Sequence, residues 1–254
     1  MAIASSDKKA LKSRKTLLTA RFSEIVALNF AIDPEILKPH VPKKLELDFF
    51  ENETYVSLVA IVLKNIRVWG LPIQIPGQFG EFNLRFYVRR PDGSRYQRGV
   101  CFLRDYVSSK SAAWILGSLF KADFRTVKMQ YENTGFNSKN LSVVPTADYR
   151  WQVDEHWNRI RVKARQRMKK TGPGTKVGFI LDHANKYGCR DGATYEYSGT
   201  QPKWTIWDAA QANFTCDVKR LFGPEFEKPL AKRPASVFVA TGSDVTIFRG
   251  CPLS

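Results

Sequence analysis

Five ionisable side chains interrupt an apolar stretch of the chain. They are Glu81, Arg85, Arg104, Asp105 and Lys110. A charged group on an otherwise apolar element must face water, be paired, or serve a binding or catalytic site. A group of this kind, with both carboxylates and cations, could orient a small anionic or keto ligand.

Glu81 and Arg85 lie four residues apart in a stretch with the pattern of a strand, so both side chains face the same side of the sheet. If that side is the interior of the protein, they form a paired polar floor for a ligand. If it is the outside, they are a surface ion pair that contributes little to stability.

The elements that carry these residues can be read from the pattern. Residues 82–88 alternate apolar and polar side chains, residues 100–106 form a second apolar run, and the turn at 91–93 predicts a hairpin between them. Residues 109–120 then carry apolar side chains at helical spacing, with Ser108 or Ser109 as N-cap. The hairpin therefore leads directly into a helix.

The rest of the chain reads as mostly β. A short helix is expected at 33–37 and a second one at 212–222, which Gly223 and Pro224 would end. Further strands are expected at 21–32, 45–50, 54–68, 126–132, 149–153, 158–168, 176–181, 193–197, 204–207, 235–240 and 244–248. We expect a basic tail at 1–20 and a single domain at 21–254, a mostly antiparallel barrel or cone with helices packed outside.

The net charge of +16 is uneven, because residues 1–21 and 121–176 supply 13 of the 16 excess positive charges. This balance favours an anionic partner, which could be nucleic acid, a membrane surface or an acidic metabolite.

One predicted strand, at 158–168, concentrates that charge on one side. Its basic side chains alternate with apolar or neutral ones, and we call them the basic face: Arg159, Arg161, Lys163, Arg165 and Arg167. One interpretation is a solvated outer face whose charges discourage edge-to-edge pairing. The other is an anion-binding face that works together with Trp151 or Trp157.

Several kinds of chemistry have no support in the sequence. The chain has no G-x-G-x-x-G, P-loop, G-x-S-x-G or H-E-x-x-H motif. Its four cysteines and three histidines lack the spacing of a metal site, so we expect no metal and no cofactor. No run of apolar residues is long enough to span a membrane, and the charged N-terminus does not resemble a secretory signal, so we expect a cytoplasmic protein with reduced thiols.

Several blocks of sequence stand out, in order along the chain. They are F-G-E-F-N-L-R-F-Y-V at 79–88, G-V-C-F-L-R-D at 99–105, F-I-L-D-H-A-N-K-Y-G at 179–188, E-Y-S-G-T-Q-P-K-W at 196–204 and P-A-S-V-F-V-A-T-G-S at 234–243. These blocks resemble the DUF2071 family, which is grouped with acetoacetate decarboxylase-like proteins. The resemblance implies a closed, cone-shaped antiparallel β-barrel that holds a pocket for a small molecule.

The resemblance also implies roles for individual residues. Acetoacetate decarboxylase forms a Schiff base between a lysine and a keto acid, with a glutamate in an aromatic-x-Glu motif. Glu81 and Lys110 take these catalytic positions here, although Ser111 stands where that enzyme has a second lysine. Lys110 could instead contact an anion without a covalent bond, or be an ordinary surface residue of the first helical turn.

The ligand-binding candidates, which resemble family positions or stand beside them, are Arg85, Arg104, Asp105, His183 and Tyr187. The last two could equally be structural. Two functions remain open: a small-molecule-binding cone protein, enzymatic or not, whose ligand is a keto acid or other small anion, and a non-enzymatic protein that binds polyanions through its basic face. The oligomeric state does not follow from the sequence.

Overall fold

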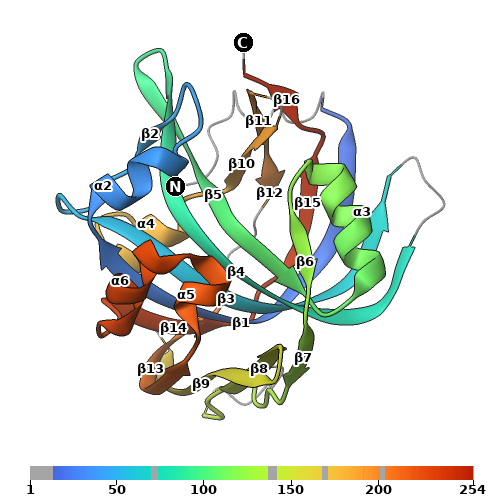
Figure 1. Cartoon of the computed structure of the whole chain (residues 1–254), viewed down its shortest axis with the longest axis vertical. Coiled ribbons are helices and arrows are strands. Elements are labelled where there is room, and N and C mark those ends of the chain that lie inside the picture. The colour runs from blue at the N-terminus through green and yellow to red at the C-terminus, as the bar shows by residue number, and fades with distance from the viewer. Residues whose placement is uncertain are drawn as a thin grey trace.

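The structure, a computed structural model, describes residues 14–69, 74–136, 142–167, 171–190, 192–200 and 204–253. Their strands form a single sheet (Figure 1). In chain order the strands are β1 (Thr16–Ile32), β2 (Glu46–Leu47), β3 (Thr54–Val68), β4 (Gln74–Asp92), β5 (Arg95–Val107), β6 (Phe124–Thr126), β7 (Lys128–Tyr131), β8 (Thr146–Val153), β9 (His156–Arg167), β10 (Asn185–Arg190), β11 (Ala193–Tyr197), β12 (Gly199–Thr200), β13 (Ile206–Thr215), β14 (Ser236–Ala240), β15 (Asp244–Phe248) and β16 (Cys251–Pro252). The helices are α2 (Pro34–Leu37), η1 (Lys38–His40), α3 (Lys110–Phe120), α4 (Lys176–Leu181), α5 (Val218–Phe222), η2 (Pro224–Phe226) and α6 (Glu227–Ala231).

The long strands β1, β3, β4 and β5 form the middle of the sheet and pair with one another in this order, all antiparallel. In β3 every residue from Thr54 to Leu63 is buried, so both faces of this strand are covered by protein. This explains why the sequence of β3 is continuously apolar rather than alternating. The strand is central, as its composition predicts.

The sheet curls but is not closed by hydrogen bonds. Its strand order runs from β16 through β11, β10, β5, β4, β3, β1, β14, β13, β9 and β8 to β7, and no ladder among the described residues joins the two ends. A mostly β architecture with an antiparallel majority is therefore confirmed, whereas a closed barrel is not. The parallel pairs are β10 with β5 and β6 with β5.

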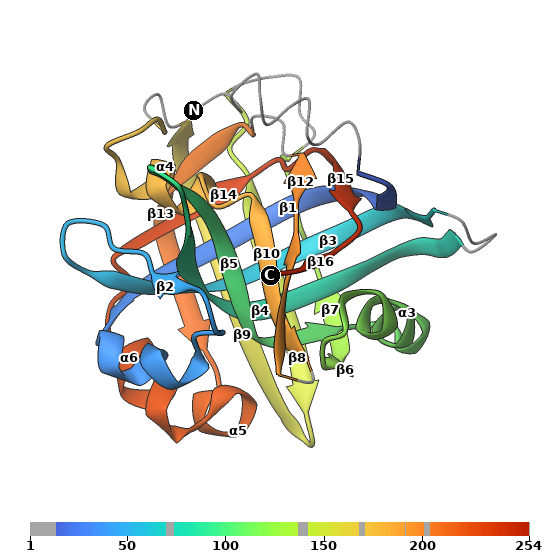
Figure 2. The ribbon, with the colours of Figure 1, turned by 90° about the horizontal axis from the view of Figure 1, so that it is seen from above.

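Side chains bring the β7–β8 end of the sheet against β4. Trp151 of β8 stacks on Phe82 of β4 with ring centroids 4.3 Å apart. Next to this contact, a Cβ atom on Gly80 would lie 2.2 Å from the Met129 sulfur, so β7 can approach β4 only because residue 80 lacks a side chain. Figure 1 shows β7 and β8 below β4, and Figure 2 shows the same strands from above.

The two faces of the central strands build two separate cores. The first contains Phe82, Leu84 and Phe86 of β4 and the buried side of β8 and β9, and its end is covered by α5 and α6. The second lies on the opposite face, under α3 and α4, and contains Phe79 and Tyr87 of β4. Alternate residues of β4 therefore enter different cores.

The helix α3 agrees with its prediction. The Ser109 hydroxyl accepts a hydrogen bond from the Ala112 amide at 3.3 Å, which is the expected N-cap. None of the helices among the described residues is long and apolar enough to cross a membrane.

Residues 176–181, expected as a strand, form the helix α4 instead. Thr175 caps it by accepting from the Gly178 amide at 3.0 Å. A short apolar run fits a buried helix as well as a strand, and here the cap decides.

The helix expected at 212–222 is also wrong in its first half. β13 continues to Thr215 because it pairs with β9, and only Val218–Phe222 is helical, after the N-cap Asp217.

At the other end of the chain, β1 begins at Thr16, so residues 16–20 belong to the sheet rather than to a tail.

The stack of Phe82 on Trp151 predicts a large effect on stability. Phe82 is fully buried, so Phe82→Ala should lower the free energy of unfolding by about 3–5 kcal/mol. Trp114→Ala, at a tryptophan that is 72% exposed, should change it by less than about 0.5 kcal/mol. Urea unfolding of both variants checks this, and equal effects would contradict a stabilising contact between Phe82 of β4 and Trp151 of β8.

Candidate active site

Polar side chains of β4 enter the second core. Glu81, Asn83 and Arg85 lie on the face of β4 opposite Phe82 and Leu84, as the period-two pattern predicts. Asn83 is 2% exposed, while Glu81 and Arg85 keep a part of their surface accessible. These three side chains are therefore enclosed between the sheet and the elements that cover it.

A β-bulge in β5 adds a carboxylate to this face. Arg104 pairs with Leu84 but Phe102 pairs with Arg85, so one extra residue, Leu103, is inserted in β5. Phe102 and Asp105, which are three residues apart, consequently face the same side. Asp105 lies opposite Asn83 and is 3% exposed.

Lys186 of β10 completes the group. β10 pairs parallel to β5, with Lys186 in register with Val100. The Lys186 ammonium nitrogen (Nζ) lies 3.7 Å from Asp105 Oδ2. It also lies 4.0 Å, 4.6 Å and 4.9 Å from the ring centroids of Phe102, Phe120 and Phe124. Three aromatic rings and a buried carboxylate thus hold this amine in place.

We call Glu81, Asn83, Arg85, Asp105 and Lys186 the polar cluster. Within it the Asn83 amide donates to Glu81 Oε1 at 2.8 Å. Burial, and then the charge of Asp105, raise the pKa of Glu81 to about 7. Burial also raises the pKa of Asp105, against the opposing charges of Lys186 and Arg85. The cluster can therefore hold and release a proton near neutral pH.

Three buried polar atoms of the cluster have no hydrogen-bond partner among the described residues. They are Asn83 Oδ1, Arg85 Nε and Asp105 Oδ1. Such atoms are rare in folded proteins, and each costs about 1–3 kcal/mol when left unpaired. Three of them in one group mark a place that suits a polar guest.

The structure brings together only some of the residues expected in the site. Glu81, Arg85 and Asp105 converge, but Lys110 is exposed at the first position of α3. Arg104 is exposed as well, and its guanidinium donates to the Leu103 carbonyl at 2.9 Å. Both residues therefore lie outside the polar cluster.

His183 belongs to a different buried group. Its Nδ1 lies 2.7 Å from the Phe179 carbonyl and its Nε2 lies 3.1 Å from Asp48 Oδ2. Burial alone would raise the pKa of Asp48, but the His183 hydrogen bond and the charges of His183 and Arg98 lower it below its ordinary value. The His183 ring also packs against the Tyr87 ring at 4.8 Å. Both ring nitrogens of His183 therefore face Phe179 and Asp48 rather than the residues of the polar cluster.

Tyr187 also lies apart from the cluster, because successive residues of a strand face opposite sides. Its hydroxyl donates to Glu196 Oε2 at 3.1 Å, and Arg90 donates to the same oxygen at 3.0 Å. A Cβ atom on Gly99 would lie 2.5 Å from the Tyr187 ring, so glycine at 99 is needed for this packing.

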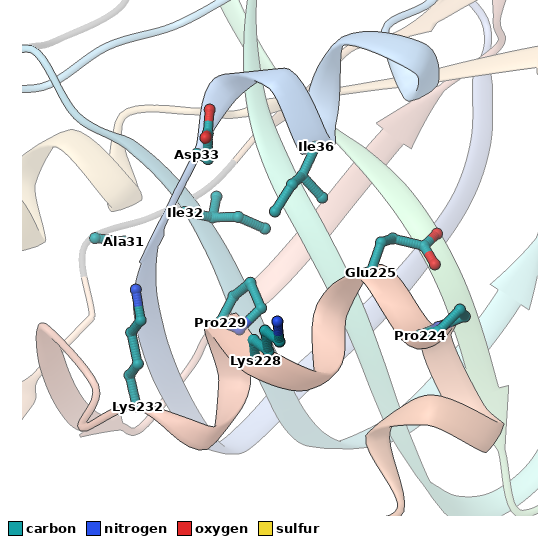
Figure 3. Close-up of a pocket in the computed structure, with 9 residues that line it drawn as sticks. All are labelled: Ala31, Ile32, Asp33, Ile36, Pro224, Glu225, Lys228, Pro229 and Lys232. Atoms are coloured by element: carbon teal, nitrogen blue, oxygen red, sulfur yellow. The ribbon is translucent and has the colours of Figure 1, made fainter.

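Two surface hollows lie elsewhere on the molecule. One of about 390 Å³ lies between α2 and the segment that contains η2 and α6 (Figure 3). Its charged residues, Asp33, Glu225, Lys228 and Lys232, have both signs and favour no ligand charge. The other, of about 430 Å³, is lined by Trp69, Lys121, Tyr195 and Arg249 among others.

Among the described residues, no group of three or more His, Cys, Asp or Glu side chains could hold a metal ion.

Residues 19–244 match the model of the DUF2071 family, which is described as an uncharacterized conserved protein. The chain belongs to this family. A curated relative, the uncharacterized protein YqjF of Bacillus subtilis (strain 168), is 34% identical over 74 residues, which cover 28% of this chain and 30% of the relative. The DUF2071 chain thus matches less than a third of that relative's length.

Solved structures of acetoacetate decarboxylase-like proteins share the fold of this DUF2071 chain. The enduracididine biosynthesis enzyme MppR complexed with pyruvate has a TM-score of 0.62 at 14% identity, over 94% of this chain and 91% of that chain. Acetoacetate decarboxylase from Legionella pneumophila subsp. pneumophila str. Philadelphia 1 has a TM-score of 0.61 at 13% identity, over 94% of this chain and 88% of that chain. An acetoacetate decarboxylase-like enzyme from Sphingomonas wittichii RW1 has a TM-score of 0.62 at 11% identity, over 94% of each of the two chains. At these identities the likeness concerns the fold alone.

Asn83 and Lys186 were not among the residues selected from the sequence. Asn83 could have been found, because it lies between Glu81 and Arg85 in the same alternation. Lys186 could not be placed, because its position depends on the parallel pairing of β5 with β10, which are distant in sequence.

The raised pKa of Glu81 predicts a pH-dependent stability. The folded chain keeps this proton up to pH about 7, whereas the ordinary value is 4.5. Stability should therefore fall as pH rises between these values, by about 3 kcal/mol. In Glu81→Gln this loss should be smaller, so the variant should gain stability relative to the parent at pH 8 but not near pH 4.5. Urea unfolding at both pH values measures this, and identical pH profiles would contradict it.

Proposed function

We propose that this protein binds a small hydroxy or keto acid at the polar cluster. The observation that carries the proposal is the set of three buried polar atoms without partners, which belong to Asn83, Arg85 and Asp105. A ligand that pairs with all three would remove an unfavourable contribution from each.

The chemistry of these atoms defines the ligand. Arg85 Nε carries a hydrogen and requires an acceptor, such as a carboxylate or carbonyl oxygen. Asn83 Oδ1 and Asp105 Oδ1 accept and require a donor, such as a hydroxyl group, when Asp105 is ionised. A ligand with both functions on a short carbon skeleton meets these demands. That similar folds include an MppR complex with pyruvate and an acetoacetate decarboxylase supports a ligand of this size and class.

The same geometry supports a covalent reaction with a keto acid. The amine of Lys186 would attack the ketone carbon, and loss of one water molecule would leave an imine between the ligand and the lysine. Glu81 would exchange the protons of this step, since its pKa of about 7 suits transfer in either direction. On this proposal Lys186 takes the role that the family resemblance gives to Lys110, which is exposed.

Binding is tested by thermal unfolding with lactate, pyruvate, acetoacetate and butyrate. A ligand of the folded state raises the Tm according to its concentration and Kd. The oxygenated acids should raise it, and butyrate, which has no hydroxyl or ketone, should not. Arg85→Gln should abolish the shift, while Arg104→Gln, a matched change at an exposed arginine, should keep it. The proposal would be contradicted if butyrate raised the Tm as much as the oxygenated acids do. It would also be contradicted if Arg85→Gln and Arg104→Gln lost the Tm shift equally.

The covalent reaction is tested by borohydride reduction with pyruvate and acetoacetate, followed by peptide mass spectrometry. We expect an adduct on Lys186 that is absent from Lys186→Arg and retained in Lys110→Arg. An adduct on Lys110 would return the role to that residue. If neither lysine is modified although the Tm shift is present, the protein binds its ligand without a covalent bond.

A further inference from the structure

The exposed side of β9 carries charge that the polar cluster does not use. From Asn158 to Ala164, buried Asn158, Ile160, Val162 and Ala164 alternate with basic residues that reach the surface. After Ala164 the pairing with β13 is irregular, and residues 165–167 are all exposed. The side chains of the basic face from Arg159 to Lys163 therefore point outward in a row, about 6.7 Å apart along the strand.

On one side, the residues of β13 that lie opposite Arg159, Arg161 and Lys163 are polar and uncharged. The acid of this strand, Asp208, lies beyond them, in the stretch where the pairing with β9 is irregular. Gln211, Asn213 and Thr215 of β13 lie opposite Lys163, Arg161 and Arg159, and all three are exposed. Neutral amides and hydroxyls beside the row can donate or accept hydrogen bonds without neutralising it.

On the other side, a single carboxylate of β8 is already shared. Asp148 accepts from Arg159 Nε at 2.8 Å and from Arg150 Nη2 at 3.2 Å, and lies 4.0 Å from Arg161. Lys163 and Arg165 form no ion pair with an acidic side chain of the described residues. The row therefore keeps an excess of positive charge.

An exposed tryptophan stands at the start of this row. Trp157 is 43% exposed and precedes Arg159 by two residues, so both lie on the same face of β9. Lys128 Nζ of β7 lies 5.5 Å from the Trp157 ring centroid. Trp151, the other tryptophan considered from the sequence, is fully buried on Phe82 and cannot contact a partner.

We propose that the basic face and Trp157 bind single-stranded nucleic acid. The phosphates would follow Arg161, Lys163 and Arg165, and an unpaired base would stack on the Trp157 ring. Proteins that bind single strands combine these two features, a line of cations for the backbone and an aromatic ring for the bases. Neither a duplex, whose bases are stacked, nor a lipid surface uses the aromatic ring in this way.

The test is fluorescence anisotropy of labelled oligouridylate between about 50 and 200 mM salt. Each lost phosphate contact lowers the slope of log K against log salt by about 0.7 for single strands. The triple variant Arg161→Gln, Lys163→Gln, Arg165→Gln should therefore lower the slope by about 2. The matched triple variant Lys38→Gln, Lys228→Gln, Lys232→Gln removes the same charge from exposed lysines elsewhere and should leave the slope unchanged.

Trp157 is tested separately, because stacking does not depend on salt. Trp157→Ala should weaken binding about 5- to 100-fold without changing the slope, and Trp157→Phe should restore most of the affinity. All substituted side chains are exposed, and circular dichroism of each variant checks that it folds.

Four results would overturn the proposal. Equal losses in the two triple variants would mean that net charge alone attracts the oligonucleotide. An unchanged affinity of Trp157→Ala would mean a surface for any polyanion. Competition by duplex DNA, heparin or phosphatidylserine vesicles as strong as that by an unlabelled single strand would exclude a preference for unpaired bases. Weak binding already at low salt would remove the site altogether.

Discussion

The bulge at Leu103 is the constraint on which the polar cluster depends. Without the extra residue in β5, Phe102 and Asp105 would face opposite sides of the sheet, because side chains alternate along a strand. The inserted residue places the carboxylate opposite Asn83 and the ring opposite Arg85, on one face. That face is the one to which Lys186 comes from β10, so its amine meets both the Asp105 carboxylate and the Phe102 ring. A single irregularity in the pairing thus assembles the cluster.

The buried charged groups of this protein differ in how completely they are paired. Asp48, between His183 and Arg98, has its charge compensated, and its pKa is lowered despite burial. In the polar cluster the balance is reversed, because burial raises the pKa of both Glu81 and Asp105. A group that only supported the fold would gain from complete pairing or from replacement by apolar side chains. The cluster keeps incompletely paired buried groups, which contribute unfavourably to the free energy of folding, and this is typical of a functional site.

The sequence predicts the parts of this arrangement that depend on local pattern. The hairpin of β4 and β5, the helix α3 and the alternation of β9 follow from periodicity and capping. The bulge, Lys186 and the helix α4 depend on pairing between distant strands or on a single cap, which periodicity does not report. The two lysines illustrate the difference: Lys110 resembles the lysine of a short family motif that follows Arg104 and Asp105 in sequence, but Lys186, some eighty residues beyond Asp105, is the lysine that lies near Asp105 in space.

The net charge of the chain does not describe the polar cluster. Two cations, Arg85 and Lys186, face two carboxyl groups, Glu81 and Asp105, so the cluster is close to neutral and becomes more positive when Glu81 takes up its proton. The excess positive charge lies elsewhere, in part on the outer side of β9, whose buried side packs in the first core rather than the second. On our proposal, hydrogen-bonding groups at close range select the ligand of the cluster, while the charge of the whole chain acts on partners that meet its surface. The polar cluster and the basic face lie on different strands and next to different cores. A substitution in one of them therefore leaves the contacts of the other in place.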